Sequence, residues 1–564
     1  GENMYRNGTW RSRARAAGLI TLATLLGAFL GSVGQTARPT PAAAGVSAVA
    51  SRGANGPTAD ALPTVQVNGI VWTQVVLGNT VFAGGKFSSA RPAGAPPGRS
   101  TIRRSNLLAF DIRTGRLIST FAPHLNGAVR TLAVSPDKKT LYVGGAFTTV
   151  NGKKRLRFAA LSPGNGALKA LAPAFSNEVR AIQPTSTAVF VGGTFTKVGS
   201  KARSRLAAIT VKNGKLRPWK PTANGEVLAL TLTPDRRSIV AGGSFSTVNR
   251  KSACGMTRLN LRKGAVLAWP VNTVVRNCGR GTAIMSLTAD GSRVYGSGYS
   301  YGGGNYEGVF AASGTGRLSW LQDCRGDTYD VAVASGRVYS VGHAHNCGNI
   351  GGFPEAKASY RALAVTTTAT GTVGSSAGGY RAFKGKPSPS LVNWFPSLTP
   401  GKVSGQVQAA WSVVASGPYV VLGGEFTAVN GVGQQGLVRM AAARYAPRKV
   451  GPQGVYADAK PTVRLGDDGC ATVAWKTVWD RDDQSLSYAL VRDGVVIDRR
   501  TVTSRFWNRT TLTVQDPGLT AGQKHRWWVE VSDPDGNRAV SATTSVSVPE
   551  PSAEPTASAD PPQD

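Results

Sequence analysis

Residues 141–147 of this chain read LYVGGAF, and this short pattern decides the fold. Related stretches are VFAGGKF at 81–87, VFVGGTF at 189–195, IVAGGSF at 239–245, VYGSGYS at 294–300, VYSVGHA at 338–344 and VVLGGEF at 420–426. Around each copy, alternating or apolar runs are separated by Pro, Asp, Asn and Gly, which predicts short strands joined by tight turns. Most copies begin 44–60 residues apart, with one gap of about 80, a period typical of one four-stranded propeller blade.

The repeats predict an all-β fold in which residues 63–447 form a seven-bladed β-propeller. Within a blade, strands are counted from the central channel outward, so the repeat is the second strand. The paired glycines are expected to be structural, because they lie inside a strand where another backbone comes close. The last unit lacks a fourth strand, and we expect residues 63–67 to supply it and so cover the open sheet edge.

The string GGxFxxVNG, followed by an RLAAL-type strand, a TG turn and LxxWxP, resembles the delta-sixty repeat propellers of secreted proteins from high-GC Gram-positive bacteria. The resemblance covers roughly residues 65–447. It implies a fold and an extracellular compartment, and it implies no particular activity.

The pattern changes after the propeller. Residues 461–548 contain short alternating strands around Trp and Tyr and resemble a fibronectin type III sandwich, with His525 where that family usually has a tyrosine. Residues 45–62 and 448–460 are expected to be linkers, and residues 549–564 a disordered Pro-rich acidic tail.

Two acidic motifs stand in the C-terminal part, DRDD at 480–483 and DPDG at 533–536. Asp is a natural turn former, so we favour two acidic turns. The alternative is chelation of calcium by five residues: Asp480, Asp482, Asp483, Asp533 and Asp535.

Residues 1–44 are predicted to be a signal peptide. Arginines follow Met4, an apolar run extends from Ala16 to Gly34, and the small residues Ala42 and Ala44 come before Gly45. An uncleaved membrane anchor is the alternative, because the run approaches the length of a bilayer span. Either way the remainder is expected outside the cell, secreted or associated with the cell wall.

The formal net charge is +35, and residues 1–450 hold 53 of the 65 basic and 14 of the 30 acidic side chains. Cations in the loops between second and third strands are candidates for binding an anionic polymer: Arg103, Arg104, Lys153, Lys154, Arg155, Lys201, Arg203, Arg205, Arg250 and Lys251. The alternative is that a basic surface only keeps the protein soluble. Sequence-specific nucleic-acid binding is not expected, since no stacking platform or recognition helix is evident.

Four of the five cysteines fall in loops at one end of neighbouring blades. An exported chain favours disulfides, and of the three possible connectivities we favour Cys254 with Cys278 and Cys324 with Cys347, because each joins adjacent loops.

The sixth repeat replaces the usual residues by histidines next to the second of these bridges. His343 and His345 are expected near Asp323, Asp327 and Asp330. Two imidazoles and a carboxylate could hold a divalent metal, and one of each could act as acid and base. The alternative is that the imidazoles bond loop backbone and brace the bridge.

The leading hypothesis is a secreted, non-catalytic binding protein whose basic propeller face binds wall polymers or acidic polysaccharide. The alternative is an extracellular polysaccharide hydrolase or lyase, with or without a metal, centred on His343, His345, Asp323 and Asp327. The sequence contains no nucleophile motif, dinucleotide fingerprint or Cys-based zinc spacing, and no cofactor other than a divalent metal is indicated.

Overall fold

The computed structural model describes residues 45–375 and 383–550, so the expected signal peptide and nearly all of the expected tail lie outside the described residues. Nearly all of the regular secondary structure in the described residues is β-strand. Its only α-helix in this range is α1 (Val455–Asp458). None of the helices described is long and apolar enough to cross a membrane. The predicted all-β class is confirmed.

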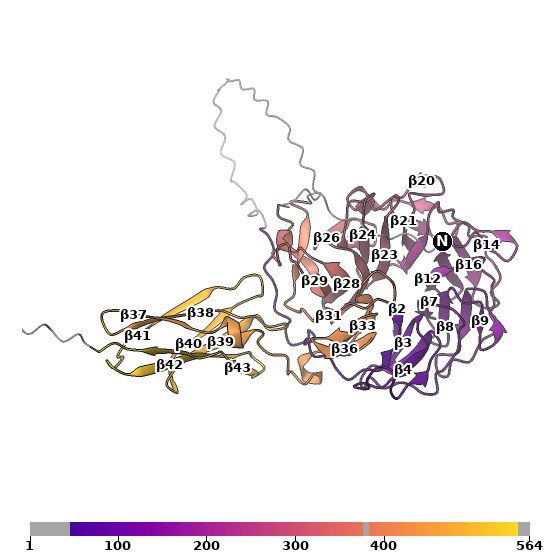
Figure 1. Ribbon diagram of the computed structural model, residues 1–564. Helices are drawn as coiled ribbons and strands as arrows, with labels where there is room; N and C mark the ends of the chain where they lie inside the picture. The colour runs from indigo at the N-terminus through magenta and orange to yellow at the C-terminus, as the bar shows by residue number, and fades with distance from the viewer. Residues whose placement is uncertain (1–44, 376–382, 551–564) are drawn as a thin grey trace, which may run out of the picture. The chain divides into compact units, whose positions relative to one another are not determined.

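Each of the seven repeats forms the second strand of a small antiparallel sheet (Figure 1). The first four sheets are β2 (Ile70–Leu77), β3 (Thr80–Lys86) and β6 (Leu107–Asp111); β7 (Val129–Val134), β8 (Leu141–Gly145) and β11 (Phe158–Leu161); β12 (Val179–Pro184), β13 (Ala188–Gly193) and β16 (Leu206–Thr210); and β17 (Val227–Leu232), β18 (Ser238–Gly243), β21 (Met256–Asn260) and β22 (Val266–Leu267). The next three are β23 (Thr282–Ala289), β24 (Arg293–Ser300), β25 (Gly308–Ser313) and β26 (Leu318–Gln322); β27 (Thr328–Ala334), β28 (Arg337–Ala344), β29 (Tyr360–Thr372) and β30 (Pro387–Leu391); and β32 (Ala410–Ser416), β33 (Tyr419–Gly424) and β36 (Leu437–Ala441).

The first strands of these sheets contact one another in cyclic order. The contacts run from β2 through β7, β12, β17, β23, β27 and β32, and β32 contacts β2 again. Buried aromatic residues fill the space between neighbouring sheets; Trp219, for example, lies in a core that the third and fourth sheets share. The arrangement is propeller-like.

The paired glycines allow the close packing of this arrangement. A Cβ atom on Gly144 would overlap the side chain of Val179 in the next sheet, and one on Gly145 would overlap the carbonyl oxygen of Ala128. The glycines therefore have the structural role that their place inside a strand predicts.

An N-terminal segment covers the edge of the seventh sheet. The backbone N–H groups of Thr58 and Leu62 donate to the carbonyl oxygens of Ala441 and Arg439, each at 2.9 Å. Closure by an N-terminal strand was predicted, but for residues 63–67. The bridges to the seventh sheet lie at Pro57 and Leu62. Val65 instead donates to the carbonyl oxygen of Gly115 in the turn after β6, while Val67 still donates to that of Gln435 next to β36.

The two expected linkers are packed segments. Within residues 45–62, the N–H of Ala50 donates to the carbonyl oxygen of Leu391 at 2.8 Å, which joins this stretch to β30. Within residues 448–460, Val455 of α1 is buried in the core of the C-terminal unit.

The C-terminal unit has two antiparallel sheets. One contains β37 (Thr462–Leu465), β38 (Ala471–Lys476) and β41 (Thr511–Asp516). The other contains β39 (Ser485–Arg492), β40 (Val495–Thr503), β42 (Lys524–Ser532), β43 (Arg538–Val540) and β44 (Thr544–Ser547). Trp475, Tyr488 and Trp527 from both sheets share one core.

Candidate functional site

Each of the seven first strands contains a β-bulge at the same place. It lies opposite the glycine pair of the second strand in five sheets, and opposite Ser297–Gly298 and Val341–Gly342 in the fifth and sixth sheets. A bulged residue has no partner across the ladder, so its side chain is aimed differently from its neighbours. The bulged residues, which we call the bulge ring, are Trp72, Arg130, Arg180, Leu228, Met285, Tyr329 and Trp411. They lie near the end of the second strands, where the loops to the third strands begin.

Members of the bulge ring from neighbouring sheets contact each other. The rings of Trp72 and Trp411 have centroids 4.9 Å apart, and Trp411 stacks on Tyr329 at 4.3 Å. The guanidinium of Arg130 lies 4.7 Å from the ring centroid of Trp72. Met285 packs against the same aromatic cluster. These contacts follow the cyclic order of the first strands and join five members of the bulge ring into one cluster.

An acidic residue holds the arginines of the ring. Nε of Arg180 lies 2.6 Å from Oε2 of Glu178, and Nε of Arg130 lies 3.8 Å from the same oxygen. One carboxylate therefore compensates part of the charge of two half-buried guanidiniums.

The repeat position directly after the second glycine holds an aromatic residue of the bulge ring in two of the sheets. Oε1 of Glu425 accepts a hydrogen bond from Nε1 of Trp411 at 3.0 Å. In the sixth repeat the equivalent residue is His343, whose Nδ1 lies 3.1 Å from Oη of Tyr329. The unusual histidine thus occupies the position from which a polar side chain reaches the bulged aromatic of its own sheet.

His343 and Asp327 are the two predicted site residues that come together. Nε2 of His343 lies 3.9 Å from Oδ2 of Asp327, and it accepts the backbone N–H of Asp327 at 3.4 Å. With Nε2 as an acceptor, the ring proton of a neutral imidazole is on Nδ1 and points to Tyr329. Burial, together with the charge of Arg361, lowers the pKa of His343 to about 4.

Asp327 is a carboxyl group that titrates near neutral pH. Burial, with the nearby charge of Glu307, raises the pKa of Asp327 to about 7. Oε2 of Glu307 accepts the N–H of Gly326 at 2.9 Å, so it borders the same loop. A carboxyl group with such a pKa beside a neutral imidazole can exchange protons with a bound molecule.

His345 and Asp323 point to other partners. Nδ1 of His345 lies 2.7 Å from Oε1 of Glu355. Asp323 is buried and its Oδ2 accepts from Nδ2 of Asn349 at 2.6 Å. Strand β28 ends at Ala344, so His345 no longer shares a strand face with His343.

In the part of the chain that the structure describes, the predicted set of His343, His345, Asp323 and Asp327 does not gather its ligand atoms as a metal site requires. Asp330, also expected nearby, lies on β27 instead. Its carboxylate accepts from Oγ of Ser286 at 2.5 Å and from the N–H of Val413 at 2.9 Å, and so joins three sheets.

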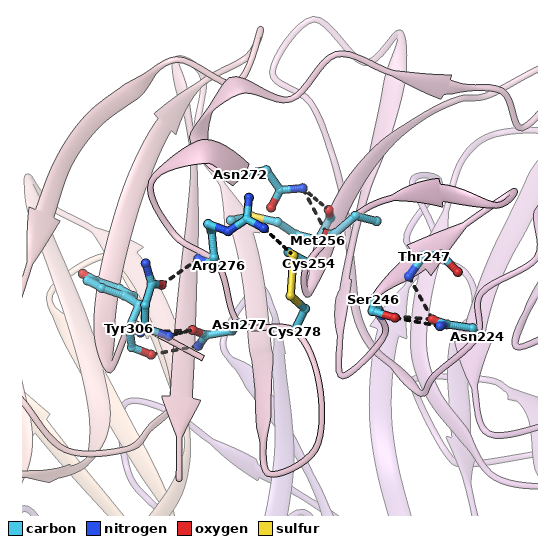
Figure 2. The surroundings of a disulfide bond; sticks show 12 residues. Asn224, Ser246, Thr247, Cys254, Met256, Asn272, Arg276, Asn277, Cys278 and Tyr306 are labelled. Atoms are coloured by element: carbon cyan, nitrogen blue, oxygen red, sulfur yellow. Dashed lines mark hydrogen bonds between the residues drawn. A yellow bond between two sulfur atoms is a disulfide. The ribbon is translucent and has the colours of Figure 1, made fainter. Parts of the chain in front are cut away.

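Both predicted disulfides are confirmed. Cys254 pairs with Cys278, 24 residues further along the chain, and Cys324 pairs with Cys347, 23 residues further along. Figure 2 shows the first bridge, with the guanidinium of Arg276 3.3 Å from Sγ of Cys254. Both bridges lie at the loop end that carries the bulge ring.

Four of the ten predicted ligand-binding cations are committed to the fold. Arg104, Arg155 and Arg203 are equivalent. Each donates to the carbonyl oxygen of the residue before it and to one in the segment that follows the third strand of its sheet. Arg205 donates to the carbonyl oxygen of Ala223 at 2.9 Å.

The other six predicted cations are exposed: Arg103, Lys153, Lys154, Lys201, Arg250 and Lys251. They lie on or next to small hairpins that include β5 (Ile102–Arg103), β10 (Lys153–Lys154), β15 (Lys201–Ala202) and β20 (Lys251–Ser252). Basic side chains also occur at the opposite ends of these sheets, where Lys138 and Lys139 are exposed in the turn between β7 and β8. The positive charge is therefore not confined to one end.

The bulge ring was not predicted from the sequence. Its residue types vary from sheet to sheet, and a bulge depends on the register between two strands. The available signal is a large or basic residue near the start of each inner strand, directly after a buried small or β-branched residue, as in Val71–Trp72 and Val129–Arg130.

No protein-family model matches the chain, and no curated protein matches it. Similar solved structures include the computationally designed Ika8 protein, at 12% identity over 84% of this chain and 98% of that chain with a TM-score of 0.35. A mitotic checkpoint complex chain matches at 11% identity over 74% and 99% with a TM-score of 0.39, and the Pan2 WD40 domain of Neurospora crassa at 11% over 66% and 90% with a TM-score of 0.38. With scores this low, these likenesses carry no inference about ligand or activity.

Proposed function

We propose that this chain is a secreted, non-catalytic binding protein of the delta-sixty repeat type, a seven-bladed β-propeller followed by a fibronectin type III sandwich. Its ligand is an anionic polymer of the cell exterior, such as a wall polymer or an acidic polysaccharide. The observation that carries this function is the exposure of six cations on the hairpins of the first four sheets, at the same end as the bulge ring.

A polymer with regularly spaced negative charges suits this surface. The hairpin cations Lys153, Lys154, Lys201 and Lys251 are exposed, so they can approach several acid groups with little loss of hydration. Trp411 and Tyr329 are only 9% and 8% exposed, so the bulge ring serves as a rigid floor rather than as open stacking faces. The two disulfides fix neighbouring loops at this end.

The test is binding of the purified chain to poly(glycerol phosphate) and to polygalacturonate across a salt series, with neutral dextran as control. Attraction between exposed charges is screened over about 8 Å at physiological ionic strength, so affinity should fall steeply with salt. Salt-independent binding, or equal binding to dextran, would contradict the proposal.

A second function, cleavage of an acidic polysaccharide as a hydrolase or lyase, is favoured by the contacts among Asp327, His343 and Tyr329. Asp327 would be the proton-transferring group, and His343 would orient Tyr329. No metal takes part in this candidate, because the two histidines point to different partners.

Cleavage is tested by incubating the chain with polygalacturonate and counting new reducing ends. Both reactions form such ends, and only a lyase also forms an unsaturated product that absorbs in the ultraviolet. If Asp327 is the acid or base, Asp327→Asn should lower the rate about 10²-fold or more. If the number of reducing ends does not rise above that in a sample without the protein, the proposed cleavage of polygalacturonate is contradicted.

A further inference from the structure

Three aspartates lie together in the turn between β38 and β39 of the C-terminal unit. One carboxylate oxygen each of Asp480, Asp482 and Asp483 lies within 4.8 Å of the others. The side chains of Asp480 and Asp482 are buried, with 2% exposure each. Burial distinguishes this group from the acidic turns that are common on protein surfaces.

Two oxygens of this cluster have no partner. Oδ1 of Asp480 accepts the N–H of Asp482 at 3.1 Å, and Oδ2 of Asp482 accepts the N–H of Ala59 at 2.5 Å. The other oxygens, Oδ2 of Asp480 and Oδ1 of Asp482, are buried and have no hydrogen-bond partner among the described residues. A buried carboxylate oxygen without a donor is unfavourable. Asp480 and Asp482 can hydrogen-bond each other only while one of the two carboxyl groups keeps a proton.

Two further carboxylates act on the same cluster. Asp533 and Asp535 come from the turn between β42 and β43, and their negative charges interact unfavourably with that of Asp483. Five carboxylates therefore converge from two turns.

Three guanidiniums offset part of this charge. Arg52 lies 2.8 Å from Asp535 and 3.4 Å from Asp483. Arg448 lies 3.6 Å from Asp535. Arg481 interacts favourably with Asp480. Three positive charges against five negative ones leave two negative charges, which a single divalent cation would neutralise.

We propose that Asp480, Asp482 and Asp483 form the core of a Ca²⁺ site. All the donors are oxygens, which excludes the thiolate and imidazole sets that Zn²⁺ prefers. Ca²⁺ accepts six to eight oxygens in irregular geometry and completes its shell with carbonyl oxygens and water, whereas Mg²⁺ releases its water reluctantly. Because Asp482 also holds the N–H of Ala59, the ion would stabilise the segment that continues into the edge of the seventh sheet.

The test is calorimetric titration of the full chain with CaCl₂ after removal of metals by a chelator. We expect one Ca²⁺ per chain, with a Kd in the range of about 10⁻⁴–10⁻³ M that is usual for extracellular modules. The melting temperature should rise with the Ca²⁺ concentration, because the ion binds the folded chain. Asp482→Asn should weaken binding at least tenfold, and the exposed Asp467→Asn should not change it.

A direct measurement covers the case in which Asp482→Asn fails to fold. Tb³⁺ should bind the unmodified chain and luminesce on excitation of tryptophan, since Trp479 directly precedes Asp480, and Ca²⁺ should displace it. Three results would overturn the proposal: no heat and no thermal shift in about 10 mM Ca²⁺, well above the expected Kd, an equal response to Mg²⁺, or unchanged binding in Asp482→Asn. In those cases a proton shared between Asp480 and Asp482, rather than Ca²⁺, would reduce the negative charge of the cluster.

Discussion

The indole nitrogen of Trp411 donates a hydrogen bond to Oε1 of Glu425, 3.0 Å away, directly after the end of the neighbouring strand β33. Glu425 is 1% exposed and also accepts the N–H of Ser404 at 2.7 Å. The contact fixes the aromatic residue that stacks on Tyr329 and packs against Trp72. In the seventh repeat, the residue after the second glycine thus supports the aromatic part of the bulge ring.

Replacing Glu425 by Ala is expected to lower the free energy of unfolding by about 1–3 kcal/mol, because a buried indole N–H loses its acceptor. Glu425→Gln keeps an acceptor oxygen and should lose less. Urea unfolding of both variants measures the difference, and an Ala variant as stable as the original would show that Trp411 finds another partner.

Asp330 predicts a pH dependence of stability. Burial raises its pKa to about 6 from 3.8. Between about pH 4 and 6 the folded chain therefore keeps a proton that the unfolded chain has lost, so stability is greatest below this window and falls as pH rises through it. The loss approaches about 3 kcal/mol above pH 6.

The pH effect is isolated by comparing the chain with Asp330→Asn in urea unfolding at several pH values. The difference in the free energy of unfolding should change between about pH 4 and 6 and be constant above that window, because all other titrating groups are common to both proteins. A difference that is constant throughout would contradict the raised pKa.

Removing the bridge between Cys324 and Cys347 is expected to lower the free energy of unfolding by about 3 kcal/mol, from the entropy that a loop of this size gains when unfolded. The double Ala variant is measured by denaturant unfolding under oxidising conditions. Cys470 is unpaired, so Cys470→Ser is the control and should change little.

The N-terminal segment is expected to protect the seventh sheet. Deletion of residues 46–62 removes the segment, including the N–H of Thr58 that donates to Ala441, and exposes the edge of β36. An open edge pairs with other chains, so the deletion should form dimers or larger species in light scattering. A monomeric deletion variant of unchanged melting temperature would show that the segment contributes nothing.

Much of the sheet architecture could be predicted from the sequence, since strand and turn residues repeat with a fixed period. The disulfides were predictable because loop ends of neighbouring sheets lie close together. The predicted metal site at His343 and His345 was wrong for a local reason. The two histidines share a face only while the strand continues, and β28 ends at Ala344. The roles of Arg104, Arg155 and Arg203 were missed because composition does not reveal which guanidiniums are used by backbone carbonyls.

Two Lys-Lys pairs at opposite ends of the second sheet provide the most direct test of polymer binding. Lys153 and Lys154 follow β8 at the end that carries the bulge ring, and Lys138 and Lys139 precede β8 at the other end; all four are exposed. Changing either pair to Glu alters the net charge equally. If the polymer binds at the bulge-ring end, the change at 153 and 154 should weaken binding to poly(glycerol phosphate) about tenfold or more, and the change at 138 and 139 about twofold or less. Equal losses would show that only net charge matters and would contradict a binding face at the bulge-ring end.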